Sequence, residues 1–142
     1  MNNIMRNFDD SFYKTILDTI PVIIFVFDED IRVRDFNSAA EKIFVLNKPV
    51  VLNRKSGDVL KCLHRLDAPE GCGHGPACKE CVIRNSVHES FLGEMVYRRR
   101  TRVHLQDESG VKDHEFFITA SRLPVQNESL SLVVIEDMTE FY

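Results

Sequence analysis

The stretch PVIIFVFDEDIRVRDFNSAAE, residues 21–41, decides the fold of this chain. Its first seven residues, 21–27, are almost all β-branched or aromatic, which predicts a buried strand. The acidic run Asp28–Asp30 is typical of a turn, and Ile31–Arg34 alternates between apolar and basic side chains as a second strand does. The sequence therefore predicts a β-hairpin.

Helices are predicted on both sides of this hairpin. Ser38 and Glu41 have the spacing of a capping box, so we expect a helix to begin there and to bury Ala40, Ile43 and Phe44. Before the hairpin, Ser11–Ile20 has the period of an amphipathic helix, with Phe12, Ile16, Leu17 and Ile20 on its apolar side. Two roles stay open for that side: it faces the core, or it forms a dimer with a second chain.

The remainder of the chain is predicted to form short helices and then strands. We expect a loop or short strand over Leu46–Arg54, a helical turn over Gly57–His64 and a longer helix over Lys79–Phe91. Three strands follow, at Met95–Leu105, His114–Leu123 and Leu130–Ile135. In the first of these, alternation predicts one face with Tyr97, Thr101, Val103 and Leu105, and another with Arg98, Arg100, Arg102 and His104.

Length and composition indicate one globular domain. The chain has 142 residues, 44% hydrophobic and 28% charged, and a net charge of -4, which argues against a nucleic-acid partner. Its first residues are polar rather than a signal peptide, and its longest apolar run, 20–27, is too short to cross a bilayer. We therefore expect a cytoplasmic protein without membrane contact, in which thiols stay reduced.

All four cysteines lie within twenty residues, at Cys62, Cys72, Cys78 and Cys81, in a segment rich in glycine and proline. Four soft ligands on a backbone free to bend indicate a metal or cluster site. Cys78 and Cys81 have the spacing C-x2-C at a predicted helix start, which should lower their thiol pKa and favour the ligating thiolate.

The spacing leaves several occupants open. One close pair plus two widely spaced cysteines favours an iron–sulfur cluster, taken as 4Fe–4S, over structural zinc, which usually draws on two close pairs. Zinc remains an alternative, with His64 or His74 replacing a cysteine. A metal-free thiol/disulfide switch is a further alternative.

The order of elements and three short motifs resemble the PAS sensor domains of bacterial signalling proteins. The motifs are ILDTIP at 16–21, FNSAAE at 36–41 and VVIEDMTE at 133–140. The resemblance covers nearly the whole chain and implies an α+β PAS fold, with a five-stranded antiparallel sheet, short helices and one longer helix on one face. It implies a single domain over 1–142, with an N-terminal helix or cap at 1–20 and a core at 21–140 that carries the cysteine loop 62–81.

The resemblance also implies a role. The cysteine pattern is similar to a cysteine-bearing subset of PAS domains in which an iron–sulfur cluster senses redox state, oxygen or iron. Asn37 is expected to secure a turn, and His88, on the longer helix, keeps a haem or small-ligand receptor open as an alternative. We expect no enzymatic activity, a homodimer through the N-terminal helix, and a downstream partner such as a histidine kinase or regulator. A PAS interaction module stapled by zinc is the other alternative.

Overall fold

The structure is a computed structural model that describes residues 10–125 and 127–142. Five strands form one antiparallel sheet in the order β2-β1-β5-β4-β3, so the first hairpin pairs with the last strand of the chain. This confirms the predicted α+β class and sheet. The strands are β1 (Ile23–Asp28), β2 (Val33–Phe36), β3 (Val96–Asp107), β4 (Gly110–Leu123) and β5 (Leu130–Asp137).

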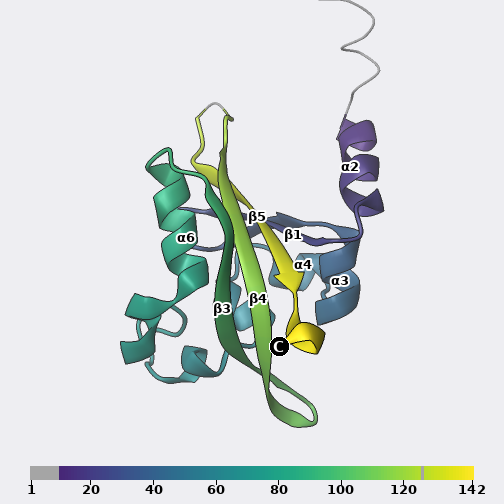
Figure 1. Ribbon diagram of the computed structural model, residues 1–142. Helices are drawn as coiled ribbons and strands as arrows, with labels where there is room; N and C mark the ends of the chain where they lie inside the picture. The colour runs from purple at the N-terminus through teal and green to yellow at the C-terminus, as the bar shows by residue number, and fades with distance from the viewer. Residues whose placement is uncertain (1–9, 126) are drawn as a thin grey trace, which may run out of the picture.

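Short helices connect the hairpin to the longer helix α6, which lies along one face of the sheet and packs on β3, β4 and β5 (Figure 1). The cysteine loop lies between α5 and α6. The α-helices are α2 (Asp10–Thr19), α3 (Ser38–Phe44), α4 (Lys48–Val51), α5 (Ser56–Leu60) and α6 (Val82–Phe91), and the 3-10 helices are η1 (Leu63–Leu66), η2 (Pro76–Glu80) and η3 (Thr139–Phe141).

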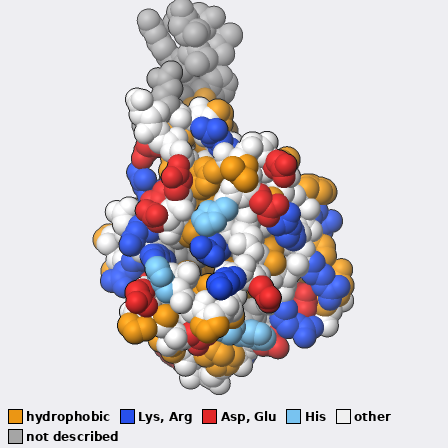
Figure 2. Space-filling model, turned by 90° about the vertical axis from the view of Figure 1, so that its left-hand side faces the viewer, with side chains coloured by type: hydrophobic (Ala, Val, Ile, Leu, Met, Phe, Trp, Pro, Cys, Tyr) orange, Lys and Arg blue, Asp and Glu red, His pale blue; other side chains and the backbone are white. Residues whose placement is uncertain are grey.

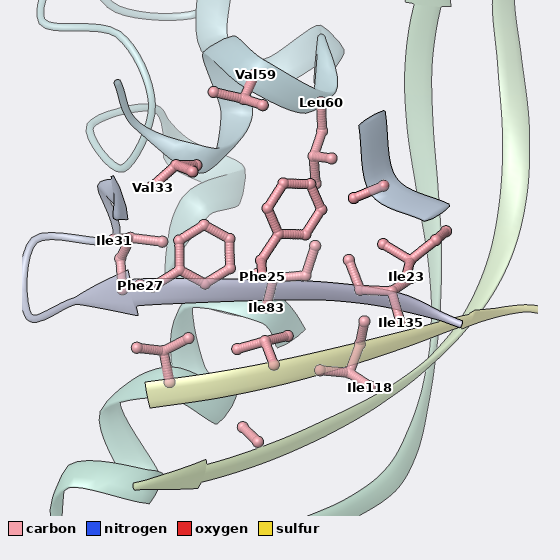
Figure 3. Close-up of a cluster of buried hydrophobic side chains, with 14 of the residues drawn as sticks. Ile23, Phe25, Phe27, Ile31, Val33, Val59, Leu60, Ile83, Ile118 and Ile135 are labelled. Atoms are coloured by element: carbon pink, nitrogen blue, oxygen red, sulfur yellow. The ribbon is translucent and has the colours of Figure 1, made fainter. Parts of the chain in front are cut away.

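The hydrophobic core lies between the sheet and the helices. Phe25 and Phe27 point from β1 toward Val59 and Leu60 of α5 (Figure 3). Alternate residues of β4 and β5 complete this face, and the register places Ile118 opposite Ile135 there. The strands predicted at His114–Leu123 and Leu130–Ile135 are thus present, as β4 and β5.

Asn37 joins four parts of the fold. Its side chain is 1% exposed, and its Oδ1 accepts hydrogen bonds from the N–H groups of Ile24 and Ala40, both at 3.1 Å. Its Nδ2 donates to the carbonyls of Leu17 (3.0 Å), Ile20 (3.3 Å) and Val22 (2.8 Å). Asn37 is thus the N-cap of α3, and the predicted capping box at Ser38 is wrong by one residue.

Two local predictions are wrong for identifiable reasons. Leu46–Arg54 contains the helix α4 instead of a loop or strand, because Pro49 stands in its first turn, where proline is tolerated. In β3 the register shifts between Val96 and Arg99, so Tyr97 is turned out to solvent, away from the side of Leu105.

Helix α2 stands at the edge of the domain (Figure 1). Its apolar side is only partly covered. Ile16 is 42% exposed and Tyr13 is 53% exposed, whereas Leu17 is half-buried. Residues 1–9 of the predicted N-terminal cap lie outside the described residues. Among the helices that the structure describes, none is long and apolar enough to cross a membrane.

Candidate metal centre

All four cysteines line one cavity of about 600 Å³. The cavity lies between α5, the cysteine loop, the start of α6 and the inner side of β3. Cys62 follows α5, Cys72 lies in the loop, Cys78 belongs to η2 and Cys81 directly precedes α6. All four thiols are free. The folded chain thus brings residues that are up to nineteen positions apart to the wall of one space.

Cys62 is attached to the sheet. Lys61 ends α5 in a left-handed conformation, and the N–H of Cys62 then donates to the carbonyl of Gly57 at 2.8 Å. The backbone of Cys62 pairs with Leu105 in an isolated antiparallel β-bridge. The N–H of Gln106 donates to the carbonyl of Lys61 at 2.8 Å. This cysteine is therefore held by backbone contacts to β3.

Cys72 packs against α5 from the loop. The N–H of Gly57 donates to its Sγ at 3.3 Å, and the Ser56 hydroxyl lies 3.9 Å from the same sulfur. Gly71 and Gly73 on either side have φ values of +85° and +93°, which favour glycine. These two glycines let the loop turn so that the Cys72 sulfur reaches a backbone N–H.

Cys78 and Cys81 lie at the entry to α6, but not on its first turn as predicted. The helix begins at Val82, three residues later than the sequence indicated, because Pro76–Glu80 forms the separate 3-10 turn η2. Cys81 is the N-cap residue of α6, and its backbone N–H donates to the carbonyl of Cys78 at 3.2 Å. Cys78 is the most buried of the four, at 7% exposed.

The thiols are close enough to influence one another electrostatically. Burial raises the pKa of the Cys62 thiol, and the negative charges that Cys81, Cys72 and Cys78 carry as thiolates raise that pKa further. Positive charge near these sulfurs would favour the thiolate form of Cys62.

At Cys81 the predicted lowering of the thiol pKa is wrong. The backbone N–H groups of Ile83 and Arg84, at the start of α6, do favour the thiolate. Burial is the larger effect and raises the pKa of Cys81 above its ordinary value. The sequence showed the helix terminus but not the depth at which this sulfur lies.

The histidines predicted as possible ligands also line the cavity. His64 has its Nδ1 2.7 Å from the carboxylate of Asp67, and His74 has its Nε2 3.2 Å from the Nζ of Lys55. His88, on α6, lines the same space. Within residues 10–125 and 127–142, however, no group of three or more Cys, His, Asp or Glu side chains is arranged so that it could hold a metal ion.

Three basic residues beside the cysteines were missed by the sequence reasoning. Lys55, Arg65 and Arg84 line the cavity and donate hydrogen bonds to cysteine carbonyls. A signal was available for two of them, because Arg65 follows Cys62 by three positions and Arg84 follows Cys81 by three. The arginines that the sequence did single out are instead paired: Arg98 with Glu136, and Arg100 and Arg102 with Glu115.

Comparison with known proteins agrees with this fold. Residues 11–73 match a family model described as PAS domain, a range that ends between Cys72 and Cys78. No curated protein matches the chain. Together the family model over 11–73 and the solved structures confirm the PAS fold.

The similar structures share the fold at low sequence identity. The PAS domain of an HTR-like protein from Haloarcula marismortui is 17% identical with a TM-score of 0.57, over 90% of this chain and 96% of that one. The PAS domain of nitrogen regulation protein NR(II) from Vibrio parahaemolyticus is 12% identical with a TM-score of 0.59, over 89% and 97%. A PAS domain from a two-component sensor histidine kinase is 10% identical with a TM-score of 0.59, over 96% and 99%.

Proposed function

We propose that this PAS domain is a sensor whose four cysteines hold an iron–sulfur cluster and report redox state, oxygen or iron. The observation that carries the proposal is that Cys62, Cys72, Cys78 and Cys81, every cysteine of the chain, line the same cavity. Buried cysteines in a core are usually scattered among apolar residues, whereas these come from four successive segments around one space.

The spacing of the cysteines in the sequence, one close pair and two distant residues, favours a cluster over a single zinc ion. Four thiolates bind zinc at about 2.3 Å from one point. The described residues contain no group set to hold a metal ion, and the four cysteines are among the residues that line a cavity of about 600 Å³. A 4Fe–4S cluster is wider than one ion and takes its ligands from farther apart, and when bound it supplies reversible one-electron chemistry and sensitivity to oxygen.

The chain's own residues connect this site to the end of the domain. Cys81 caps α6, and α6 packs on β4 and β5. Strand β5 leads to the C-terminal turn η3. Just before this turn, the N–H of Met138 donates to the backbone carbonyl of Glu115 in β4 at 2.8 Å. A change in how Cys81 is held therefore acts on a helix that contacts the strand leading to the C-terminus, where a downstream histidine kinase or regulator can read it.

We infer a cytoplasmic homodimer that pairs through α2. The exposed apolar side chains of Tyr13 and Ile16 support this pairing. Sedimentation of the wild type and of Ile16→Glu tests it: we expect a dimer and a monomer respectively. A wild type that remains monomeric at high concentration would exclude this arrangement.

A haem or small-ligand receptor is the second candidate. His88 lines the same cavity, and the volume of that cavity is in the range of ligand pockets. Absorption separates the two. A Soret band that survives Cys78→Ala and disappears in His88→Ala would establish haem.

The main experiment is anaerobic purification with iron, acid-labile sulfide and zinc determined per chain. We expect brown protein with iron and sulfide, and loss of both in Cys72→Ser and Cys81→Ser. Ser109→Ala, in the exposed turn between β3 and β4 and outside the cavity lining, is the control that should keep the metal. Colourless protein with one zinc per chain would refute the cluster and indicate a structural zinc site. Full metal content in both serine variants would remove these cysteines from the ligand set.

A further inference from the structure

Three cationic side chains donate hydrogen bonds to the backbone carbonyls of three of the four cysteines. The Nζ of Lys55 donates to the carbonyl of Cys72 at 3.3 Å. A guanidinium nitrogen of Arg65 donates to the carbonyl of Cys62 at 2.8 Å, and one of Arg84 donates to the carbonyl of Cys78 at 3.4 Å. Lys55, Arg65 and Arg84 are all half-buried, and all line the cysteine cavity.

These cations are not neutralised by carboxylates. Across the described part of the chain, no Asp or Glu oxygen forms an ion pair with Lys55, Arg65 or Arg84, although most other arginines do form such pairs. The cavity as a whole is lined by five Lys or Arg side chains and three Asp or Glu side chains, in a protein whose net charge is -4, and one of the five, Arg102, is paired with Glu115 outside the lining. The space around the cysteines is therefore locally positive.

Figure 2 shows the side of the molecule that carries α6 and the cysteine loop, where basic side chains and histidines gather around the middle of the face. A carbonyl oxygen and the sulfur of the same cysteine are joined through four bonds, so each cation lies within roughly 8 Å of one sulfur. That separation is comparable with the Debye length at physiological salt, so solvent ions screen the interaction only in part.

Backbone groups add to this positive environment. The N–H of Gly57 donates to the Cys72 sulfur, and the N–H groups of Ile83 and Arg84 favour the Cys81 thiolate. Each of the four cysteines therefore has a cationic side chain or an N–H group beside it. A neutral or cationic occupant gains nothing from this arrangement, whereas an anionic one is stabilised from several sides.

We propose that Lys55, Arg65 and Arg84 make the cysteine cavity a site for an anionic metal–thiolate centre, and that their charges set its reduction potential. The inference rests on the proposed function. Four thiolates give a bound cluster a net negative charge, and one-electron reduction by an external donor adds one more negative charge to it. Fixed cations nearby favour that added charge, so removing a cation should make reduction harder.

The test is a potentiometric titration of anaerobically purified protein with dithionite, followed by absorption. Lys55→Gln, Arg65→Gln and Arg84→Gln keep an N–H donor for the cysteine carbonyl but lose the charge. Each should lower the equilibrium constant for one-electron reduction about tenfold, or about 59 mV. Lys55→Arg, Arg65→Lys and Arg84→Lys keep the charge and should stay near the wild type.

Arg54→Gln is the matched control, because the Nε of Arg54 also donates to a carbonyl, that of Val50 at 2.8 Å, but Arg54 does not line the cavity. The proposal is overturned if no glutamine variant shifts more than this control, or if glutamine and charge-keeping variants shift alike. Where a glutamine variant fails to load, metal loss confined to it supports the proposal, and equal loss in its charge-keeping partner overturns it. Wild-type protein without iron and sulfide instead refutes the proposed function, and this inference with it.

Discussion

Gly57→Ala should displace the side chain of Cys72, a proposed metal ligand, while all four cysteines stay in the sequence. A Cβ at Gly57 would lie 2.8 Å from the Cys72 Sγ and 2.9 Å from the Cys72 Cβ. Ordinary contacts between such atoms are about 3.5–4.0 Å, so the Cys72 side chain has to move by roughly 1 Å. The same movement lengthens the hydrogen bond that the Gly57 N–H donates to that sulfur, now 3.3 Å.

The substitution has opposing effects on stability. Gly57 lies in α5, and alanine is favoured over glycine in a helix by about 1 kcal/mol. Overpacking against Cys72 costs about 1–3 kcal/mol, so we expect a net loss of no more than about 2 kcal/mol in the free energy of unfolding. The effect on the site should be larger, because misplacing a metal ligand through its surroundings typically costs 10–100-fold in metal affinity.

The assay compares iron and sulfide per folded chain, and the rate of iron loss to excess chelator, in the wild type, Gly57→Ala and Asp58→Ala. Asp58 is the exposed neighbour of Gly57 in the same helix and serves as the control. We expect Gly57→Ala to lose iron 10–100-fold faster while its far-UV circular dichroism stays unchanged. A folded Gly57→Ala protein that holds its metal as well as Asp58→Ala would refute the placement of Cys72 in the ligand set.

The remaining predictions concern the fold. Asn37→Ala leaves five buried or part-buried backbone groups without their partner and should cost about 3 kcal/mol or more in urea unfolding. Asn47→Ala, at an N-cap without a side-chain bond, should cost under about 0.5 kcal/mol. Ser86→Ala removes a buried hydroxyl for which the described residues offer no partner, so it should raise stability by about 1 kcal/mol; a loss would indicate an unseen partner. Hydrogen bonds from arginine side chains lower the pKa of Glu115, so its stabilising effect is present above about pH 4.5 and disappears as pH falls through the folded-state pKa. Unfolding of the wild type and Glu115→Gln should differ at pH 7 and converge in acid; a difference that persists at pH 2 would contradict this.

Much of the fold was predictable because its signals are local. The β-branched run at 21–27 and the alternation in β4 and β5 record which side chains face the core, and strand assignment needs little else. The N-cap of α3 was missed by one residue because Asn37 and Ser38 are both good caps. What selects Asn37 is contact with the carbonyls of Leu17, Ile20 and Val22, which only the folded chain brings together.

The candidate site was predictable in part. The clustering of four cysteines in sequence predicted a shared ligand set, which stays a prediction, and the structure places all four in the wall of one cavity. Gly57 and Lys55 could not be found this way, because they meet Cys72 from fifteen and seventeen positions away. The raised pKa of Cys81 also depends on burial by the rest of the fold, which no local motif records.

The four cysteines differ in how firmly the fold holds them, and this difference favours a sensor over a staple. Cys62 and Cys81 pack against the hydrophobic core, one beside β3 and the other at the start of α6. Cys72 and the buried Cys78 lie outside that core cluster, on a segment of turns and the short 3-10 helix η2. The core cluster is built from the sheet and from α3, α5 and α6, and none of its buried members lies within 63–80. Segments with few core contacts open at low free-energy cost. A centre bound by all four cysteines would therefore join a weakly held loop to a firmly held framework. Its loss would release the loop and the cap of α6 while the sheet stays folded, and a sensor needs that kind of local, reversible change.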